Sequence, residues 1–202
     1  MQRVIAYIDG YNLYFGLREK GWKRFYWLNI QKLAGQFLKP GQKLVETKYF
    51  TTIVKYPNDK RLRQQEFLEA LQTLPDFYFF YGHFLADPVT CHHCGHTYTT
   101  HHEKMTDVNI SVELMKDAFQ DRFDLALLVS ADSDLVSPIR TVRQLFARKK
   151  AISIFPPGRS SAALKKVATD VLHIGHVELS KSLFPDQVVK GSEILKRPAK
   201  WR

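Results

Sequence analysis

The chain has 202 residues, 45% of them apolar, which is enough to bury a substantial core as one domain. Its 30 Lys and Arg outnumber its 20 Asp and Glu, and the resulting formal charge of +10 favours a nucleic-acid partner. No segment approaches the roughly 18 consecutive apolar residues of a membrane span, and the N-terminus does not resemble a signal peptide, so we expect a cytoplasmic protein without a membrane partner.

Strand-like and helix-like segments alternate along the chain. Strands are predicted at residues 4–8, 44–54, 77–85, 124–129, 151–155 and 171–174. Helices are predicted at residues 12–20, 29–38, 58–74, 107–119, 134–147, 161–168 and 177–183, with Asn29 and Asn58 as N-caps. This alternation predicts an α/β fold with a mostly parallel sheet over residues 1–180. A Cys- and His-rich hairpin is inserted at 87–104, and a basic tail follows at 181–202.

Four aspartates stand where predicted strands give way to loops or helices. Asp9 follows the apolar run 4–8, Asp107 opens a helix, and Asp132 and Asp134 follow the apolar run 125–129. Taken singly, each has an ordinary explanation as a helix cap or a turn residue. Together they should meet, because the carboxyl ends of parallel strands share the edge where such folds bind ligands. Carboxylates that close repel one another unless a cation neutralises them, and Mg²⁺ or Mn²⁺ favours such oxygen ligands.

Three sequence blocks carry a family resemblance. They are Val4-Ile-Ala-Tyr-Ile-Asp9-Gly-Tyr-Asn12-Leu, Glu103-Lys-Met-Thr-Asp107-Val and Leu-Val-Ser130-Ala-Asp132-Ser-Asp134-Leu. In this order they resemble the NYN (LabA-like) branch of the PIN-like nucleases, and the resemblance runs from about residue 3 to 175.

The resemblance implies a doubly wound α/β fold with helices on both faces and a divalent-metal-dependent ribonuclease that hydrolyses RNA phosphodiester bonds. By position, Asp9, Asp107, Asp132 and Asp134 match the family's acidic metal site for Mg²⁺ or Mn²⁺. Asn12, Ser130 and Ser133 match the polar residues beside those acids. Lys104 lies in the family's Glu-Lys pair and is a candidate phosphate contact, with a solvent-facing lysine as the alternative.

A second set of candidate RNA contacts follows the strand at 151–155. The loop from Phe155 to Ser161 should emerge on the same sheet edge as the acids and lead into a helix N-terminus, where phosphate binds readily. Arg159 is the candidate backbone contact, Lys165 and Lys166 extend the basic strip, and Ser160 or Ser161 is expected to cap the helix.

The insertion begins Cys91-His-His-Cys94-Gly-His96, and His101-His102 follow. A Cys-x-x-Cys turn supplies two thiolates, and tetrahedral zinc needs two more ligands, here assigned to His96 and His101, with His93 and His102 as alternatives. A hairpin pairing 89–90 with 97–100 would bring a distal histidine back toward the thiolates. The competing interpretations are a polar hairpin with free thiols and a redox motif, although Gly95 argues against the latter.

Several functions compete for this pattern. The leading hypothesis is a metal-dependent endoribonuclease acting on RNA, and the alternative is a non-catalytic PIN-like module that binds RNA or a protein. A phosphatase would want a second acid two residues after Asp9, and a dinucleotide-binding enzyme would want a Gly-x-Gly-x-x-Gly turn; the chain has neither. The sequence leaves open a homo-oligomer, the RNA preference and activity on DNA.

Overall fold

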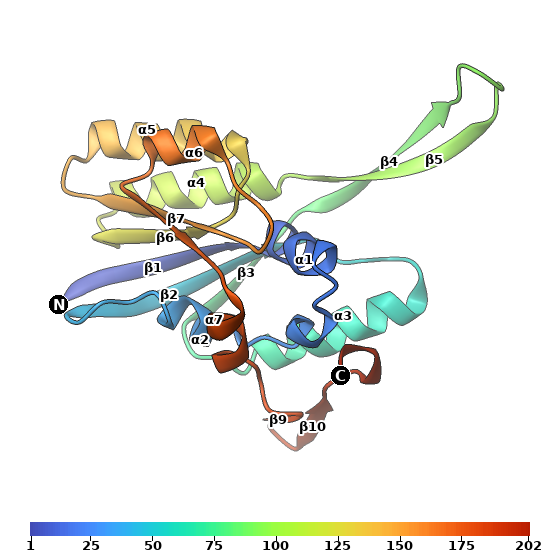
Figure 1. Ribbon diagram of the computed structural model, residues 1–202, viewed down its shortest axis with the longest axis horizontal. Helices are drawn as coiled ribbons and strands as arrows, with labels where there is room; N and C mark the ends of the chain where they lie inside the picture. The colour runs from blue at the N-terminus through green and yellow to red at the C-terminus, as the bar shows by residue number, and fades with distance from the viewer.

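In the computed structural model, the chain folds around a six-stranded, wholly parallel sheet (Figure 1). The structure describes residues 1–85, 88–100 and 103–202. The strand order is β3-β2-β1-β6-β7-β8. The strands are β1 (Gln2–Asp9), β2 (Gln42–Thr51), β3 (Phe77–Tyr81), β6 (Leu125–Val129), β7 (Lys150–Phe155) and β8 (Asp170–His173). The α/β prediction is confirmed.

Helices cover both faces of the sheet, as the doubly wound fold requires (Figure 1). Alternation along β1 explains this arrangement: Val4, Ala6 and Ile8 enter one buried core, whereas Ile5 and Tyr7 enter the other. One face carries α1 (Gly10–Glu19), η1 (Lys23–Tyr26), α2 (Ile30–Gly35), α3 (Asn58–Leu71) and α7 (His176–Lys181). The other carries α4 (Thr106–Phe119), η2 (Ser133–Leu135), α5 (Val136–Leu145) and α6 (Ala162–Val167).

The chain changes direction between β1 and β6. From β1 it adds β2 and β3 on one side, then crosses back to place β6 on the other side of β1. The chain after β1 continues over one face of the sheet, and the chain after β6 continues over the opposite face. Such a switch point is where open α/β sheets bind their ligands.

A two-stranded arm projects from this edge. It consists of β4 (His83–Thr90) and β5 (Thr97–Lys104), which pair antiparallel, and it extends well beyond the body of the molecule (Figure 1). The predicted strand at 77–85 is in fact two strands with a break at Gly82. A Cβ there would lie 2.5 Å from the carbonyl oxygen of Lys104 and 2.8 Å from Oγ1 of Thr52, so only glycine fits where the arm leaves the sheet.

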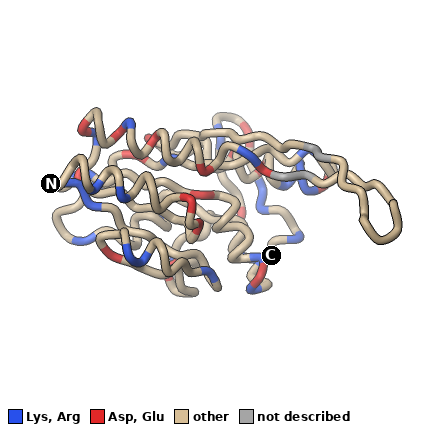
Figure 2. Tube along the Cα trace, turned by 90° about the horizontal axis from the view of Figure 1, so that it is seen from above, with Lys and Arg blue, Asp and Glu red and all other residues tan. Residues whose placement is uncertain are grey.

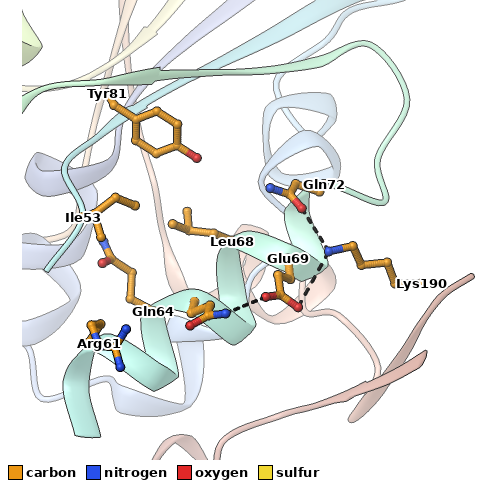
Figure 3. A pocket seen from close by; sticks show the side chains of 9 residues that line it. Ile53, Arg61, Gln64, Leu68, Glu69, Gln72, Tyr81 and Lys190 are labelled. Atoms are coloured by element: carbon orange, nitrogen blue, oxygen red, sulfur yellow. Dashed lines mark hydrogen bonds and ion pairs between the residues drawn. The ribbon is translucent and has the colours of Figure 1, made fainter. Parts of the chain in front are cut away.

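The C-terminal segment, expected as a basic tail, folds back on α3. It forms the hairpin β9 (Gln187–Lys190) and β10 (Glu193–Lys196) and ends in η3 (Ala199–Trp201). Lys190 Nζ lies 3.7 Å from Oε2 of Glu69 on α3 and 3.1 Å from Oε1 of Gln72, the C-cap residue of that helix (Figure 3). The Trp201 ring packs against Trp27, at a centroid distance of 6.4 Å. The segment thus completes the core on that face of the sheet.

One charged cluster is buried within the fold. Lys48 on β2 is 2% exposed, and its Nζ lies 2.8 Å from Glu113 Oε2 and 2.5 Å from Asp117 Oδ2, both on α4. Tyr7 donates a hydrogen bond of 2.6 Å to the same Asp117 oxygen. The cluster ties α4 to the central strands, and thereby fixes the helix whose first turn carries Asp107.

Two local predictions need correction or completion. Asn58 does not cap α3: the N-cap is Pro57, and the Asn58 side chain accepts hydrogen bonds from the Arg61 guanidinium. Asn29 does cap α2, accepting from the Lys32 amide at 2.8 Å. Within the described part of the chain, no helix is both long and apolar enough to cross a bilayer.

Candidate active site

Asp9 is the most buried of the candidate acids. It ends β1 with 4% of its surface exposed, and its Oδ1 accepts the Asn12 amide at 2.9 Å, which caps α1. Its Oδ2 accepts the Ser130 hydroxyl at 2.9 Å. Burial raises the pKa of Asp9 to about 6, while these two hydrogen bonds act to lower it. The Asp9 side chain is therefore both the N-cap of α1 and a candidate metal ligand.

Asn12 and Ser130 join the ends of β1 and β6 into one polar network. The Asn12 Oδ1 accepts the Ala131 amide at 3.1 Å. The Ser130 Oγ, which donates to Asp9, also accepts the Asp132 amide at 3.0 Å. These side chains hold the loop after β6 against the first residues of α1, which sets the position of Asp132.

Three acids meet at this edge from two segments far apart in sequence. One carboxylate oxygen each of Asp107, Asp132 and Asp134 can be chosen so that all three lie within 4.8 Å of one another. Asp107 lies in the first turn of α4, while Asp132 caps η2 by accepting the Asp134 amide at 3.0 Å. Such spacing permits shared coordination of one cation.

The pKa of Asp107 shows how the acids of the cluster affect one another. Burial, as the largest cause, and the charges of Asp9, Asp132, Glu103 and Asp134, in that order, together raise the pKa of its carboxyl to about 7. Asp9 is not a member of this group of three, but its charge acts on Asp107 more strongly than the charge of Asp132 or Asp134. The structure therefore places the four predicted acids at one sheet edge, with three in mutual reach and Asp9 close enough to raise the pKa of Asp107.

Glu103 is a fifth acid at the site, and the sequence interpretation passed over it in favour of Lys104. Its Oε1 accepts the Thr106 amide at 3.2 Å, the Thr106 hydroxyl and the Thr52 hydroxyl at 3.3 Å. Glu103 thus stabilises the start of α4, where Met105 adopts the left-handed conformation with φ of 80°. The available signal was the spacing, since a glutamate three residues before Thr106 can reach that residue's amide.

The predicted basic contacts are dispersed. Arg159 donates to Glu19 Oε1 at 2.6 Å, at the end of α1 opposite Asp9. Lys165 and Lys166 are exposed on α6, which packs beside η2, and Lys104 is exposed at the base of the arm. Ser161 caps α6 through the Leu164 amide at 3.3 Å, as expected. Lys and Arg are distributed over much of the chain rather than gathered in one strip (Figure 2).

The Cys-x-x-Cys turn lies at the tip of the arm. Cys91 and Cys94 are free thiols, and the turn closes through the Cys91 amide to the His96 carbonyl and the Gly95 amide to the Cys91 carbonyl, each at 2.9 Å. The backbone amides of Cys94 and His93 point to the Cys91 sulfur and lower its pKa. Among the described residues, His96 does not form a three-ligand group with the two thiols. His101, the proposed fourth ligand, lies outside the described residues.

Comparison with known proteins supplies the family. The chain matches the model of the NYN domain over residues 3–175. It belongs to the NYN domain family. NYN domains are PIN-like nucleases, so membership supports a nuclease role for this chain at that general level.

One solved structure of similar fold comes from Vibrio parahaemolyticus and is described as a protein of unknown function. It superposes on this NYN protein with a TM-score of 0.59 at 18% sequence identity, covering 91% of this chain and 96% of that one. At this identity the likeness shows the fold alone. No match was found among curated proteins.

Proposed function

We propose that this NYN protein is a divalent-metal-dependent endoribonuclease. The observation that carries the proposal is an uncompensated acidic cluster in a chain of net charge +10. None of Asp9, Asp107, Asp132 and Asp134 forms an ion pair with a described Lys, Arg or His. Clustered charge of one sign is costly unless a cation joins it.

The donor set fits Mg²⁺ or Mn²⁺, because every candidate ligand is a carboxylate oxygen. Asp107, Asp132 and Asp134 would hold the ion directly, and Asp9 would add negative charge to the site. When bound, the ion would polarise the scissile phosphate and supply hydroxide from water at neutral pH.

The residues around the acids would orient them for this task. Ser130 and Asn12 fix Asp9 and the Asp132 loop through hydrogen bonds within the chain, which require neither metal nor substrate. Because the pKa of Asp107 is about 7, its carboxyl is partly protonated near neutral pH. A cation would have to displace that proton in order to bind. Metal affinity should therefore increase as the pH rises through 7.

A cleavage assay tests the proposal. Wild-type protein should cut RNA with Mg²⁺ or Mn²⁺ and lose activity in EDTA, whereas Asp132→Asn should lose at least 100-fold with metal present. Asp170→Asn, an exposed acid at the amino end of β8, is the matched control and should retain activity. Equal activity of wild type and Asp132→Asn would refute the assignment and favour the non-catalytic RNA- or protein-binding module. Parallel reactions on DNA of the same sequence define the substrate range.

We also propose that Cys91 and Cys94 bind a structural zinc ion. The support is the turn geometry, in which backbone amides stabilise the Cys91 thiolate. The remaining ligands are assigned to His96 and His101. Metal analysis of the purified protein should find about one zinc per chain, lost in the double variant Cys91→Ser and Cys94→Ser. A stoichiometry near zero in the wild type would contradict this assignment.

A further inference from the structure

A large cavity begins beside the acidic cluster and is not explained by metal binding. Its volume is about 940 Å³, and it lies between α1 and α3 with Trp201 in its wall. Gly10 and Tyr11, the two residues after Asp9, line it, as does Phe84 at the base of the arm. The volume is at the upper end of the range of about 300–1,000 Å³ for small-molecule sites. An occupant would therefore contact the two residues that directly follow Asp9.

Aromatic side chains form much of the cavity wall. The Tyr11 and Phe84 rings meet edge to face at 6.0 Å, Tyr14 and Tyr26 at 5.0 Å, and Tyr26 packs on Trp201 at 5.7 Å. Tyr56 is different: its side chain is 85% exposed, and within the described part of the chain its ring contacts no other aromatic ring. A flat apolar ring left in water beside a cavity is well placed to stack on a flat ligand.

The charge of the cavity is of one sign. Six Lys or Arg side chains line it, and no Asp or Glu is among its described lining residues. Arg63 and Lys200 are paired with Asp59. The other four form no ion pair with any described acid: Arg18, Lys23, Lys55 and Lys60. The cavity therefore offers aromatic faces and free cations to its occupant, next to carboxylates that would hold a cation.

We propose that this cavity binds unstacked bases of single-stranded RNA and so directs the adjoining phosphodiester to the acids. The inference rests on the proposed nuclease function and specifies its substrate class. Base stacking on aromatic rings with cations along the backbone is the usual chemistry of single-strand recognition. Duplex RNA cannot enter in this way because its bases are already stacked and paired. An acidic peptide would match the charge but would leave the exposed Tyr56 face without a flat partner.

The smaller hollow on the other side of α3 does not share these features. Its volume is about 320 Å³, and Glu69 in its wall is paired with Lys190 (Figure 3). It is lined by α3, Ile53, Tyr81 and Lys190, and neither Gly10 nor Tyr11, the residues that follow Asp9, borders it. The larger cavity, and not this one, therefore combines a wall rich in aromatic rings with Lys and Arg side chains that form no ion pair with a described acid, next to the end of β1.

Binding measured without cleavage tests the proposal separately from catalysis. Asp132→Asn protein in EDTA would be titrated into a fluorescently labelled 12-nucleotide single strand, the same strand with abasic central positions, and the corresponding duplex. Adding Tyr56→Ala or Tyr14→Ala should weaken binding to the intact strand by about 5- to 100-fold, the loss expected for one stacked base. Tyr56→Phe should restore it, because the ring remains.

Phe119→Ala is the matched control. Phe119 is 81% exposed at the far end of α4, about 18 Å along the helix from Asp107. We expect it to leave affinity unchanged, and the abasic strand and duplex to bind more weakly than the intact strand and to be insensitive to Tyr56→Ala. Equal affinity for intact and abasic strands, or no effect of either tyrosine substitution, would overturn the base-binding site even if the enzyme cleaves RNA. Conversely, tyrosine-dependent binding by a protein that never cleaves would retain this site and refute the nuclease function.

Discussion

Replacing Asp107 by Asn should stabilise the metal-free protein while abolishing its activity. The carboxyl of Asp107 has a pKa of about 7 instead of 3.8, so its ionised form is disfavoured in the folded state. At about 1.4 kcal/mol per pKa unit this corresponds to about 4 kcal/mol. Asp107 is only half-buried, and solvent screening reduces the effect to about 2 kcal/mol. The lost interaction with the dipole of α4 removes up to about 1 kcal/mol more, leaving a net gain of about 1 kcal/mol.

The size of this stabilising effect depends on pH. Because the folded pKa lies above the unfolded value, ionisation of Asp107 costs no stability below about pH 4, and the cost grows as the pH rises to about 7. Thermal unfolding in EDTA should therefore give Asp107→Asn a melting temperature about 2–4 °C above wild type at pH 8, with no difference at pH 4. Saturating Mg²⁺ or Mn²⁺ should reverse the order at pH 8, since only the intact site gains binding energy.

Asp170→Asn is the control and should match wild type throughout. A lower melting temperature for Asp107→Asn in EDTA at pH 8 would refute the reasoning, because it would mean that the acids do not repel one another in the folded protein.

Three further predictions concern the scaffold. Lys48→Met should cost about 3–5 kcal/mol in guanidinium unfolding, because it removes the buried cation that lies between the carboxylates of Glu113 and Asp117. Lys43→Met, at an exposed position on the same strand, should change stability by less than about 0.5 kcal/mol. Gly10→Ala should destabilise by about 1–3 kcal/mol, because a Cβ there would lie 2.8 Å from the Phe50 carbonyl oxygen; Gly35→Ala, with open space around it, should be neutral or stabilising, and equal effects would contradict this. Ser130→Ala removes a hydrogen bond that holds the Asp9 pKa down, so the acid limb of the pH–activity profile should move to higher pH, and an unmoved limb would argue against a role for Asp9 ionisation.

The order and kind of most elements could be read from the chain because their signals are local. The continuous apolar runs at β1 and β6 predict buried parallel strands, and caps such as Asn29 mark helix starts. Where the prediction failed, a contact distant in sequence decided the outcome. Gly82 breaks an aromatic strand because the Lys104 backbone passes against it, and the C-terminal segment is ordered because Trp201 finds the rings of Trp27 and Phe67.

By itself, the sequence identified the candidate site residues: the acids after the first and fourth predicted strands and at the start of a helix, and the Cys-x-x-Cys turn. Local patterns suffice for that, since a strand end and a helix start are defined by their neighbours. Only the tertiary structure decided their relations, because those depend on strand order. It placed Asp107 with Asp132 and Asp134, brought the charges of Asp9 and Glu103 to bear on Asp107, and formed an aromatic cavity next to the end of β1 from segments as distant as Tyr11 and Trp201.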